Sequence, residues 1–147
     1  MRASVRRERC FSVGADLVWA AVSRPELLDR WFPGVVSCHL VADVRTVTLA
    51  TGISLEEEIL TCDALQRRFQ YRITGGLFRE HLATLDVLDA GAGRSLVIYA
   101  CDADPAAMAI ILGGAMAAAL EELGRQLERG EGPVPDALAP SAVGGAV

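Results

Sequence analysis

The chain has 147 residues and a mass of 15.6 kDa, a size that suits one domain able to bury about 70% of its unfolded surface. Its formal net charge of −5 argues against a dedicated nucleic-acid-binding protein, which usually carries a basic face. All 14 basic residues are arginine, a bias typical of GC-rich bacterial coding.

The N-terminal part of the chain predicts one strand and two short helices. Residues Val5–Val13 alternate in polarity and indicate a strand, whose arginines we expect at a solvated sheet edge. No apolar run follows Met1–Arg9, so we expect no signal peptide. Apolar residues recur at helical spacing in Ala15–Ser23, and a second short helix begins at Pro25 and ends at Pro33-Gly34.

The middle of the chain predicts about six consecutive strands. Their expected ranges are Val35–Val41, Val44–Thr51, Ile53–Cys62, Arg67–Thr74, Glu80–Leu88 and Ser95–Asp102. The connections are too short for crossover helices, so neighbouring strands must be mostly antiparallel.

A long helix of small residues follows. Asp104-Pro105 is expected to open it as cap residue and first-turn proline, and Gly130 to end it. Its apolar stripe comprises Met108, Ile111, Leu112, Met116, Leu120, Leu123 and Leu127. Residues Pro105–Leu120 fall short of the roughly 20 apolar residues that a membrane span requires, so no stable membrane insertion is expected.

The abundance of Ala and Gly in this helix predicts incompletely filled space beneath it, which is typical of a ligand pocket. Gly113-Gly114 would be tolerated either because the helix approaches the sheet closely or because it bends and opens the pocket. The element order predicts an α+β fold in which a curved antiparallel sheet of about seven strands wraps around the long helix. Residues 1–130 form the expected single domain, and residues 131–147 a flexible tail.

Several short motifs occur in a distinctive order. They are Phe11-Ser12-Val13-Gly14-Ala15 with Val18-Trp19, then Trp31-Phe32-Pro33, Glu57-Glu58-Ile59 with Asp63, Arg67–Ile73, and Gly93–Asp102 before Asp104-Pro105. In this order the chain resembles the START-like (SRPBCC) superfamily, and within it the polyketide cyclase/dehydrase-like branch. The resemblance implies a helix-grip fold with a cavity between sheet and long helix for an apolar or aromatic molecule.

Glu57 is the first candidate for chemistry. It shares a strand face with Ile53, Leu55 and Ile59, so an inward face would place a carboxyl group among apolar residues and raise its pKa. It would then donate to a ligand carbonyl or act as a general acid. Two alternatives stay open: Glu57 pairs with a neighbouring arginine such as Arg68 or Arg72, or the register differs and Glu56 and Glu58 point inward.

Two tyrosines and two histidines are further candidates. Tyr71 and Tyr99 lie on apolar strand faces, either as core residues or with a hydroxyl directed at a ligand. His81 shares a face with Ala83 and Leu85, either bonded to a backbone carbonyl or serving as a base or ligand donor. His39 has a weaker claim of the same kind.

The remaining expected pocket residues are apolar. Trp31 is either a lid or a packing residue at the cavity mouth, and methionines suit an adaptable wall. The full expected lining is Trp31, Glu57, Phe69, Tyr71, His81, Tyr99, Met108, Leu112 and Met116. The catalytic candidates within this set are Glu57, His81 and Tyr71.

The cysteines Cys10, Cys38, Cys62 and Cys101 are far apart and show no CxxC spacing, so we expect buried, reduced side chains. No metal site or cofactor is expected. The preferred hypothesis is a cytoplasmic binder or carrier of a small hydrophobic, aromatic or lipid-like molecule. A cyclase or dehydratase acting on a polyketide-like substrate is the first alternative, and a protein-interaction module with a filled interior the second. A homodimer through exposed strand or helix surface stays open.

Overall fold

Seven antiparallel strands form one sheet in the order β1-β7-β6-β5-β4-β3-β2. The computed structural model describes residues 1–133. Its elements are β1 (Ala3–Phe11), α1 (Ala15–Val22), the 3₁₀ helix η1 (Pro25–Arg30), β2 (Val35–Val41), β3 (Val44–Leu49), β4 (Ser54–Asp63), β5 (Arg68–Thr74), β6 (Glu80–Gly91), β7 (Arg94–Asp104) and α2 (Ala106–Glu128). The predicted α+β architecture is confirmed, and its arrangement is that of a helix-grip fold.

The sheet is built from consecutive hairpins. Only β1 pairs out of sequence order, closing against β7, so that β1 and β2 form the two edges. Short turns join the strands, and at the predicted β3–β4 turn Gly52 adopts a φ of 88°, which glycine reaches without the strain that a Cβ would add.

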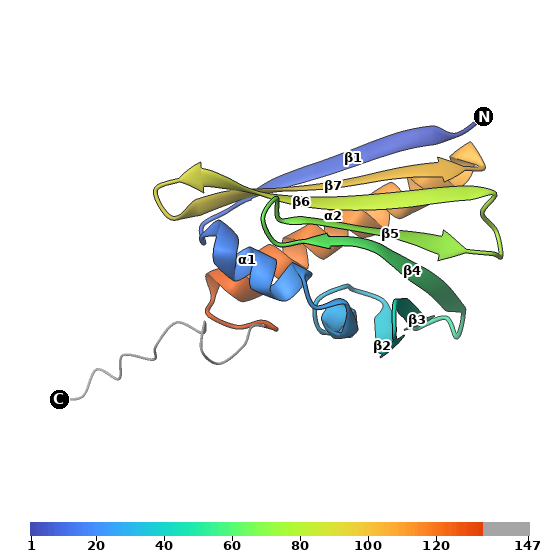
Figure 1. Cartoon of the computed structure of the whole chain (residues 1–147), viewed down its shortest axis with the longest axis horizontal. Coiled ribbons are helices and arrows are strands. Elements are labelled where there is room, and N and C mark those ends of the chain that lie inside the picture. Colours follow the sequence, from blue (N-terminus) through green and yellow to red (C-terminus); the bar gives the residue numbers. More distant parts are fainter. Residues whose placement is uncertain (134–147) are drawn as a thin grey trace.

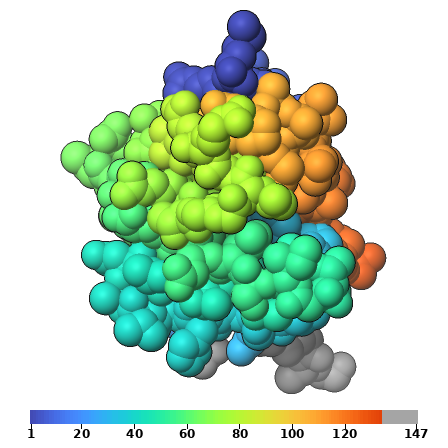
Figure 2. Space-filling model, turned by 90° about the vertical axis from the view of Figure 1, so that its right-hand side faces the viewer, coloured from blue at the N-terminus to red at the C-terminus, as the bar shows by residue number. Residues whose placement is uncertain are grey.

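The three helices cover the same face of the twisted sheet (Figure 1). Helix α2 packs along β1 and β7, α1 packs over β6 and β7, and η1 packs against β2. Their apolar residues merge with the inward residues of the strands into one core, in which Phe11, Val97, Tyr99 and Leu123 are fully enclosed. Figure 2 shows the first turns of α2 lying beside the segment between β5 and β6.

Small residues of α2 serve close packing against β1. A Cβ built on Gly113 would lie 2.8 Å from Cγ2 of Val5, and one on Gly124 would lie 1.5 Å from Nη1 of Arg9. The predicted close approach of helix and sheet is therefore confirmed at Gly113. The same packing occurs at Gly124, so at these two positions the space beneath the helix is occupied rather than empty. Gly114 is exposed and its Cβ would meet nothing within 4 Å.

Two details of α2 differ from expectation. Ile111 is 64% exposed and does not belong to the buried stripe; it lies on the outward face of α2 together with Ile110, which is 77% exposed. Asp104 is not the cap residue: it ends β7 and pairs with Arg79 at 2.6 Å, which leaves Pro105 at the cap position. By length and composition α2 could cross a membrane, but one face of it forms the core of this soluble-type fold.

The edge prediction for β1 is confirmed in position, although Arg9 is half-buried. It lies against α2 and pairs with Glu121 and Glu128, at 3.2 and 2.6 Å. The expectation for the cysteines is wrong in part: Cys101 is buried and Cys38 half-buried, but Cys10 and Cys62 are exposed. Cys10 is exposed because it alternates with inward-facing neighbours along β1. Residues 134–147, which make up most of the expected flexible tail, lie outside the described residues.

Candidate functional site

Glu57 lies in the middle of β4 on the face that turns toward the helices. It is 5% exposed, whereas Glu56 is exposed and Glu58 pairs on the outer surface with Arg72 at 2.6 Å. Side chains alternate along a strand, so one inward acid requires two outward neighbours. The predicted face of β4 is confirmed for Glu57, and the alternative in which Glu56 and Glu58 point inward is wrong.

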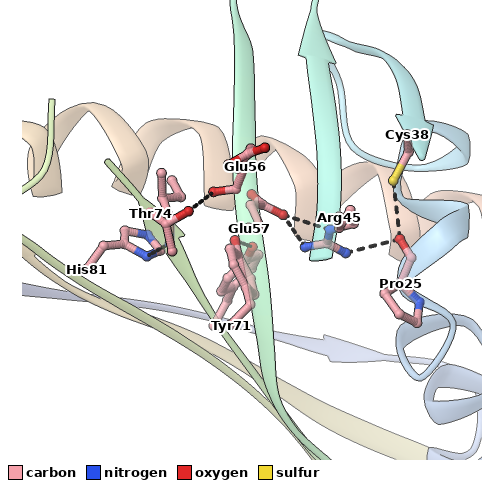
Figure 3. A network of polar contacts seen from close by, with 10 residues as sticks. Pro25, Cys38, Arg45, Glu56, Glu57, Tyr71, Thr74 and His81 are labelled. Atoms are coloured by element: carbon pink, nitrogen blue, oxygen red, sulfur yellow. Dashed lines mark hydrogen bonds and ion pairs between the residues drawn. The ribbon is translucent and has the colours of Figure 1, made fainter. Parts of the chain in front are cut away.

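The partner of Glu57 is Arg45, which stands directly opposite it on β3. Nε of Arg45 donates to Oε2 of Glu57 at 2.7 Å, and Nη1 donates to the carbonyl of Pro25 at 3.1 Å (Figure 3). The expected ion pair therefore exists, but with a different arginine.

Arg68 and Arg72, the partners considered from the sequence, lie on the outer face of β5. Arg68 pairs with Asp86 at 2.8 Å, and Arg72 pairs with Glu58. Both arginines alternate with the inward-facing Phe69 and Tyr71. Their side chains therefore cannot reach the same face of the sheet as Glu57.

The ion pair is enclosed by aromatic rings. Arg45 is 2% exposed, and its guanidinium carbon lies 5.0 Å from the ring centroid of Tyr71 and 5.7 Å from that of Phe69. Both distances suit cation–π attraction. Burial raises the pKa of Glu57 while the charge of Arg45 opposes that rise. Burial alone would lower the pKa of Arg45, but Glu57 and the other neighbours raise it overall, so the arginine stays charged.

Hydrogen-bonding capacity is left over in this pair. Nη2 of Arg45 lies 2.5 Å from Oε2 of Glu57 but forms no aligned hydrogen bond. Within residues 1–133 it is the one fully enclosed side-chain nitrogen or oxygen without such a partner. Oε1 of Glu57 also has no partner among these residues, and since it is not among the enclosed atoms, part of its surface remains open.

The hydroxyl groups of Tyr71 and Tyr99 hydrogen-bond to each other inside the core. Both side chains are buried, and burial raises the pKa of each above its ordinary value, so both phenols are neutral. One hydroxyl donates to the other, so one phenolic hydrogen of the pair has no acceptor among the described residues. The core reading of the two tyrosines is confirmed, and a donor remains unused.

His81 is buried on β6 beside Tyr71, with ring centroids 5.7 Å apart. Its Nδ1 accepts a hydrogen bond from the backbone N–H of Ile73 at 2.9 Å, rather than donating to a backbone carbonyl as expected. Burial lowers its pKa to about 4, so the ring is neutral near pH 7 and its hydrogen resides on Nε2. His81 is therefore a donor at that nitrogen, which has no partner among the described residues.

The bond to His81 forms where two strands separate. The ladder between β5 and β6 ends at the pair Tyr71 and Ala83, and two residues further along β5 the N–H of Ile73 bonds to the imidazole of His81. An open groove of about 300 Å³ lies at this point, lined by Arg72, Ile73, Thr74, Gly75, Phe78, Arg79, Glu80 and His81. The groove places His81 between the outer surface and the tyrosine pair.

Comparison with known proteins assigns the chain to a family. Residues 2–128 match the family described as polyketide cyclase/dehydrase and lipid transport. The chain belongs to this family. Among curated proteins, no sequence matches.

Solved structures share the fold of this chain. An uncharacterised protein from Bacillus thuringiensis is 22% identical with a TM-score of 0.75, covering 84% of this chain and 97% of its own. Norcoclaurine synthase from Thalictrum flavum, in complex with dopamine and hydroxybenzaldehyde, is 15% identical with a TM-score of 0.74, and 90% of each chain is covered. A protein from Thermobifida fusca is 21% identical with a TM-score of 0.66, covering 85% and 89%. At these levels of sequence identity, the similarity shows a shared fold alone.

Five of the residues named so far form what we call the polar cluster: Arg45, Glu57, Tyr71, Tyr99 and His81. Of the other residues expected in the lining, Phe69 packs against Arg45 in this cluster. Trp31 is buried in the core beside Phe32, with ring centroids 6.0 Å apart. On α2, Met116 is buried while Met108 and Leu112 are half-buried. His39 is exposed on β2 and does not join the cluster. Within residues 1–133 no group of three or more His, Cys, Asp or Glu residues could hold a metal ion.

Arg45 is the residue of the cluster that we did not predict. A signal for it exists, because Val47 and Leu49 were assigned to one face of their strand and Arg45 has the same parity. A hairpin turn around Gly52 then sets Arg45 opposite Glu57.

Proposed function

We propose that this protein binds a small hydrophobic molecule between the inward face of the sheet and α2. The observation that carries the proposal is the polar cluster on a face that is otherwise apolar. Its members satisfy one another only in part: Nη2 of Arg45 is fully enclosed without an aligned partner, and Oε1 of Glu57 and Nε2 of His81, which are not fully enclosed, have none among the described residues. Buried polar groups normally have partners, so this unused capacity supports a bound molecule with one or two polar atoms.

The family supports the same proposal in coarser form, since its description includes lipid transport as well as cyclases and dehydrases. Norcoclaurine synthase, which shares the fold, is in complex with dopamine and hydroxybenzaldehyde. Under this proposal the shape of the apolar layer selects the ligand, and the polar cluster orients it.

Binding of the neutral dye Nile red, followed by its fluorescence and by native mass spectrometry, tests this function. Leu112→Trp adds bulk on the half-buried face of α2 and should weaken dye binding at least tenfold. Ile110→Trp adds the same ring on the exposed face of the helix and should leave it unchanged. No binding to the wild type, with no small molecule carried through purification, would refute the proposal and favour an interaction module.

A cyclase or dehydratase is the second candidate, favoured by a buried carboxyl group with a raised pKa beside phenolic hydroxyls. Under this alternative, Glu57 would move the proton and a tyrosine hydroxyl would stabilise developing negative charge on the substrate. His81 is the weaker base, because its Nδ1 is already occupied by the N–H of Ile73. A molecule that copurifies with the protein should then change in mass on incubation with wild type, but not with Glu57→Gln.

A further inference from the structure

The polar cluster contains one positive and one negative side chain. Among the described residues, Arg45 and Glu57 are the only buried side chains that carry a full charge near pH 7: the pKa of His81 is lowered to about 4, and burial raises the pKa values of Tyr71, Tyr99 and Cys101. The two charges contact each other directly, through Nε and Oε2 at 2.7 Å. No buried counter-ion is therefore left over for a charged ligand.

We infer that the bound molecule is uncharged and carries a hydroxyl group, an alcohol or a phenol, that donates to Oε1 of Glu57. This inference rests on the proposed function and names the class of ligand for that site. Arg45 then acts as a specificity-determining residue: by neutralising Glu57 from the β3 side, it leaves Oε1 as the free acceptor. A carboxylate ligand would face Glu57 without a counter-ion of its own.

The unused donors and acceptor fit a hydroxyl group better than a carbonyl group. A hydroxyl both donates and accepts, so it can donate to Oε1 of Glu57 and also accept a hydrogen from Nη2 of Arg45, the enclosed donor without an aligned partner, or from the Tyr71–Tyr99 pair. A ketone or aldehyde can only accept, and would leave Oε1 without a donor. Figure 3 shows Glu57 and Tyr71 lying next to each other, with His81 on one side and Arg45 on the other.

Three probes of one shape test the inference: naphthalene, naphthol and the corresponding naphthoate, each measured near pH 7 by displacement of Nile red. Wild type should bind naphthol about tenfold more tightly than naphthalene, the effect of one hydrogen bond to a charged acceptor. It should bind naphthoate at least tenfold more weakly than naphthol, because the carboxylate enters beside an ionised Glu57 without a counter-ion.

Three variants test whether the preference for naphthol comes from Glu57 or from a general change in the structure. Glu57→Gln leaves Arg45 without its counter-charge, so naphthoate should now bind more tightly than naphthol. Glu58→Gln is the matched control, since it breaks an ion pair on the outer face of the same strand and should preserve the wild-type order. If Glu57→Gln does not fold, the double variant Arg45→Met/Glu57→Leu replaces both charges and should bind naphthol and naphthalene equally.

Every outcome bears on the inference. Naphthoate binding to wild type as tightly as naphthol would overturn it, as would a naphthol preference that survives in the double variant. If Nile red binds and naphthol does not displace it, the inference fails while the proposed function stands. If Nile red does not bind to wild type at all, the proposed function itself fails.

Discussion

Removing Arg45 alone should destabilise the protein far more than removing both members of its ion pair. At 2.7 Å and an effective dielectric constant of about 20, the attraction between the two charges is about 6 kcal/mol. Burying the charges opposes this attraction by several kcal/mol per ion, so the net contribution of the intact pair is small. Arg45→Met leaves the Glu57 charge buried without a partner and should lower the free energy of unfolding by about 3–5 kcal/mol.

Urea unfolding followed by tryptophan fluorescence measures this free energy for wild type, Arg45→Met, Glu57→Leu and the double variant. We expect the double variant to lie within about 1.5 kcal/mol of wild type, because both replacements conserve volume and suit the apolar surroundings. The two single losses would then add to several kcal/mol more than the loss in the double variant. Additive losses would refute the reasoning, since residues that are energetically coupled cannot give them.

The single variant also makes a pH-dependent prediction. Burial raises the pKa of Glu57, and loss of Arg45 removes the one neighbour that lowers it. The folded state of Arg45→Met then binds a proton that the unfolded state, with its lower pKa, does not hold. The difference in free energy of unfolding between wild type and Arg45→Met should therefore shrink as the pH falls from about 8 to about 5.5. A deficit that stays constant over this range would show that Glu57 does not remain buried and charged.

The stability of wild type should fall by up to about 3 kcal/mol between pH 6.5 and about 4, because His81 has a folded pKa of about 4 and the unfolded state takes up the proton first. His81→Phe should flatten this part of the urea-midpoint profile. Gly113→Ala should lose about 1–3 kcal/mol because its Cβ would lie 2.8 Å from Cγ2 of the short, branched Val5, whereas the exposed Gly114→Ala should gain up to about 1 kcal/mol in urea unfolding. The chain's two tyrosines are the buried pair Tyr71 and Tyr99, so tyrosinate absorbance should appear on alkaline titration only together with unfolding, and an earlier rise would contradict their raised pKa values.

The strand pattern predicted which residues point inward, because alternation is a property of each strand by itself. Phe69 and Tyr71 on β5 and Glu57 on β4 all occupy the faces that the sequence assigned to them. The predicted partners of Glu57 were wrong, because which residues pair depends on the register between two neighbouring strands. The same alternation that placed Phe69 and Tyr71 inward already excluded Arg68 and Arg72.

The bond between His81 and Ile73 could not be predicted from periodicity. It exists because β5 and β6 separate after Tyr71, and that separation depends on how the loop between the two strands closes. The prediction that Asp104 caps α2 was wrong for a related reason. A sequence that suits a helix cap also suits the end of a strand, and the contact with Arg79 that decides between them comes from a distant loop.

The small residues of α2 predicted a cavity, but a different feature of the structure supports a ligand site. Side chains of β1 occupy the space beside Gly113 and Gly124, so the small residues of the helix do not by themselves support a ligand site. What supports it is the cost of keeping Arg45 and Glu57 inside, where apolar residues of similar size would serve stability equally well. If the double variant is as stable as wild type yet loses its preference for naphthol, stability cannot account for the buried pair and recognition of a ligand can.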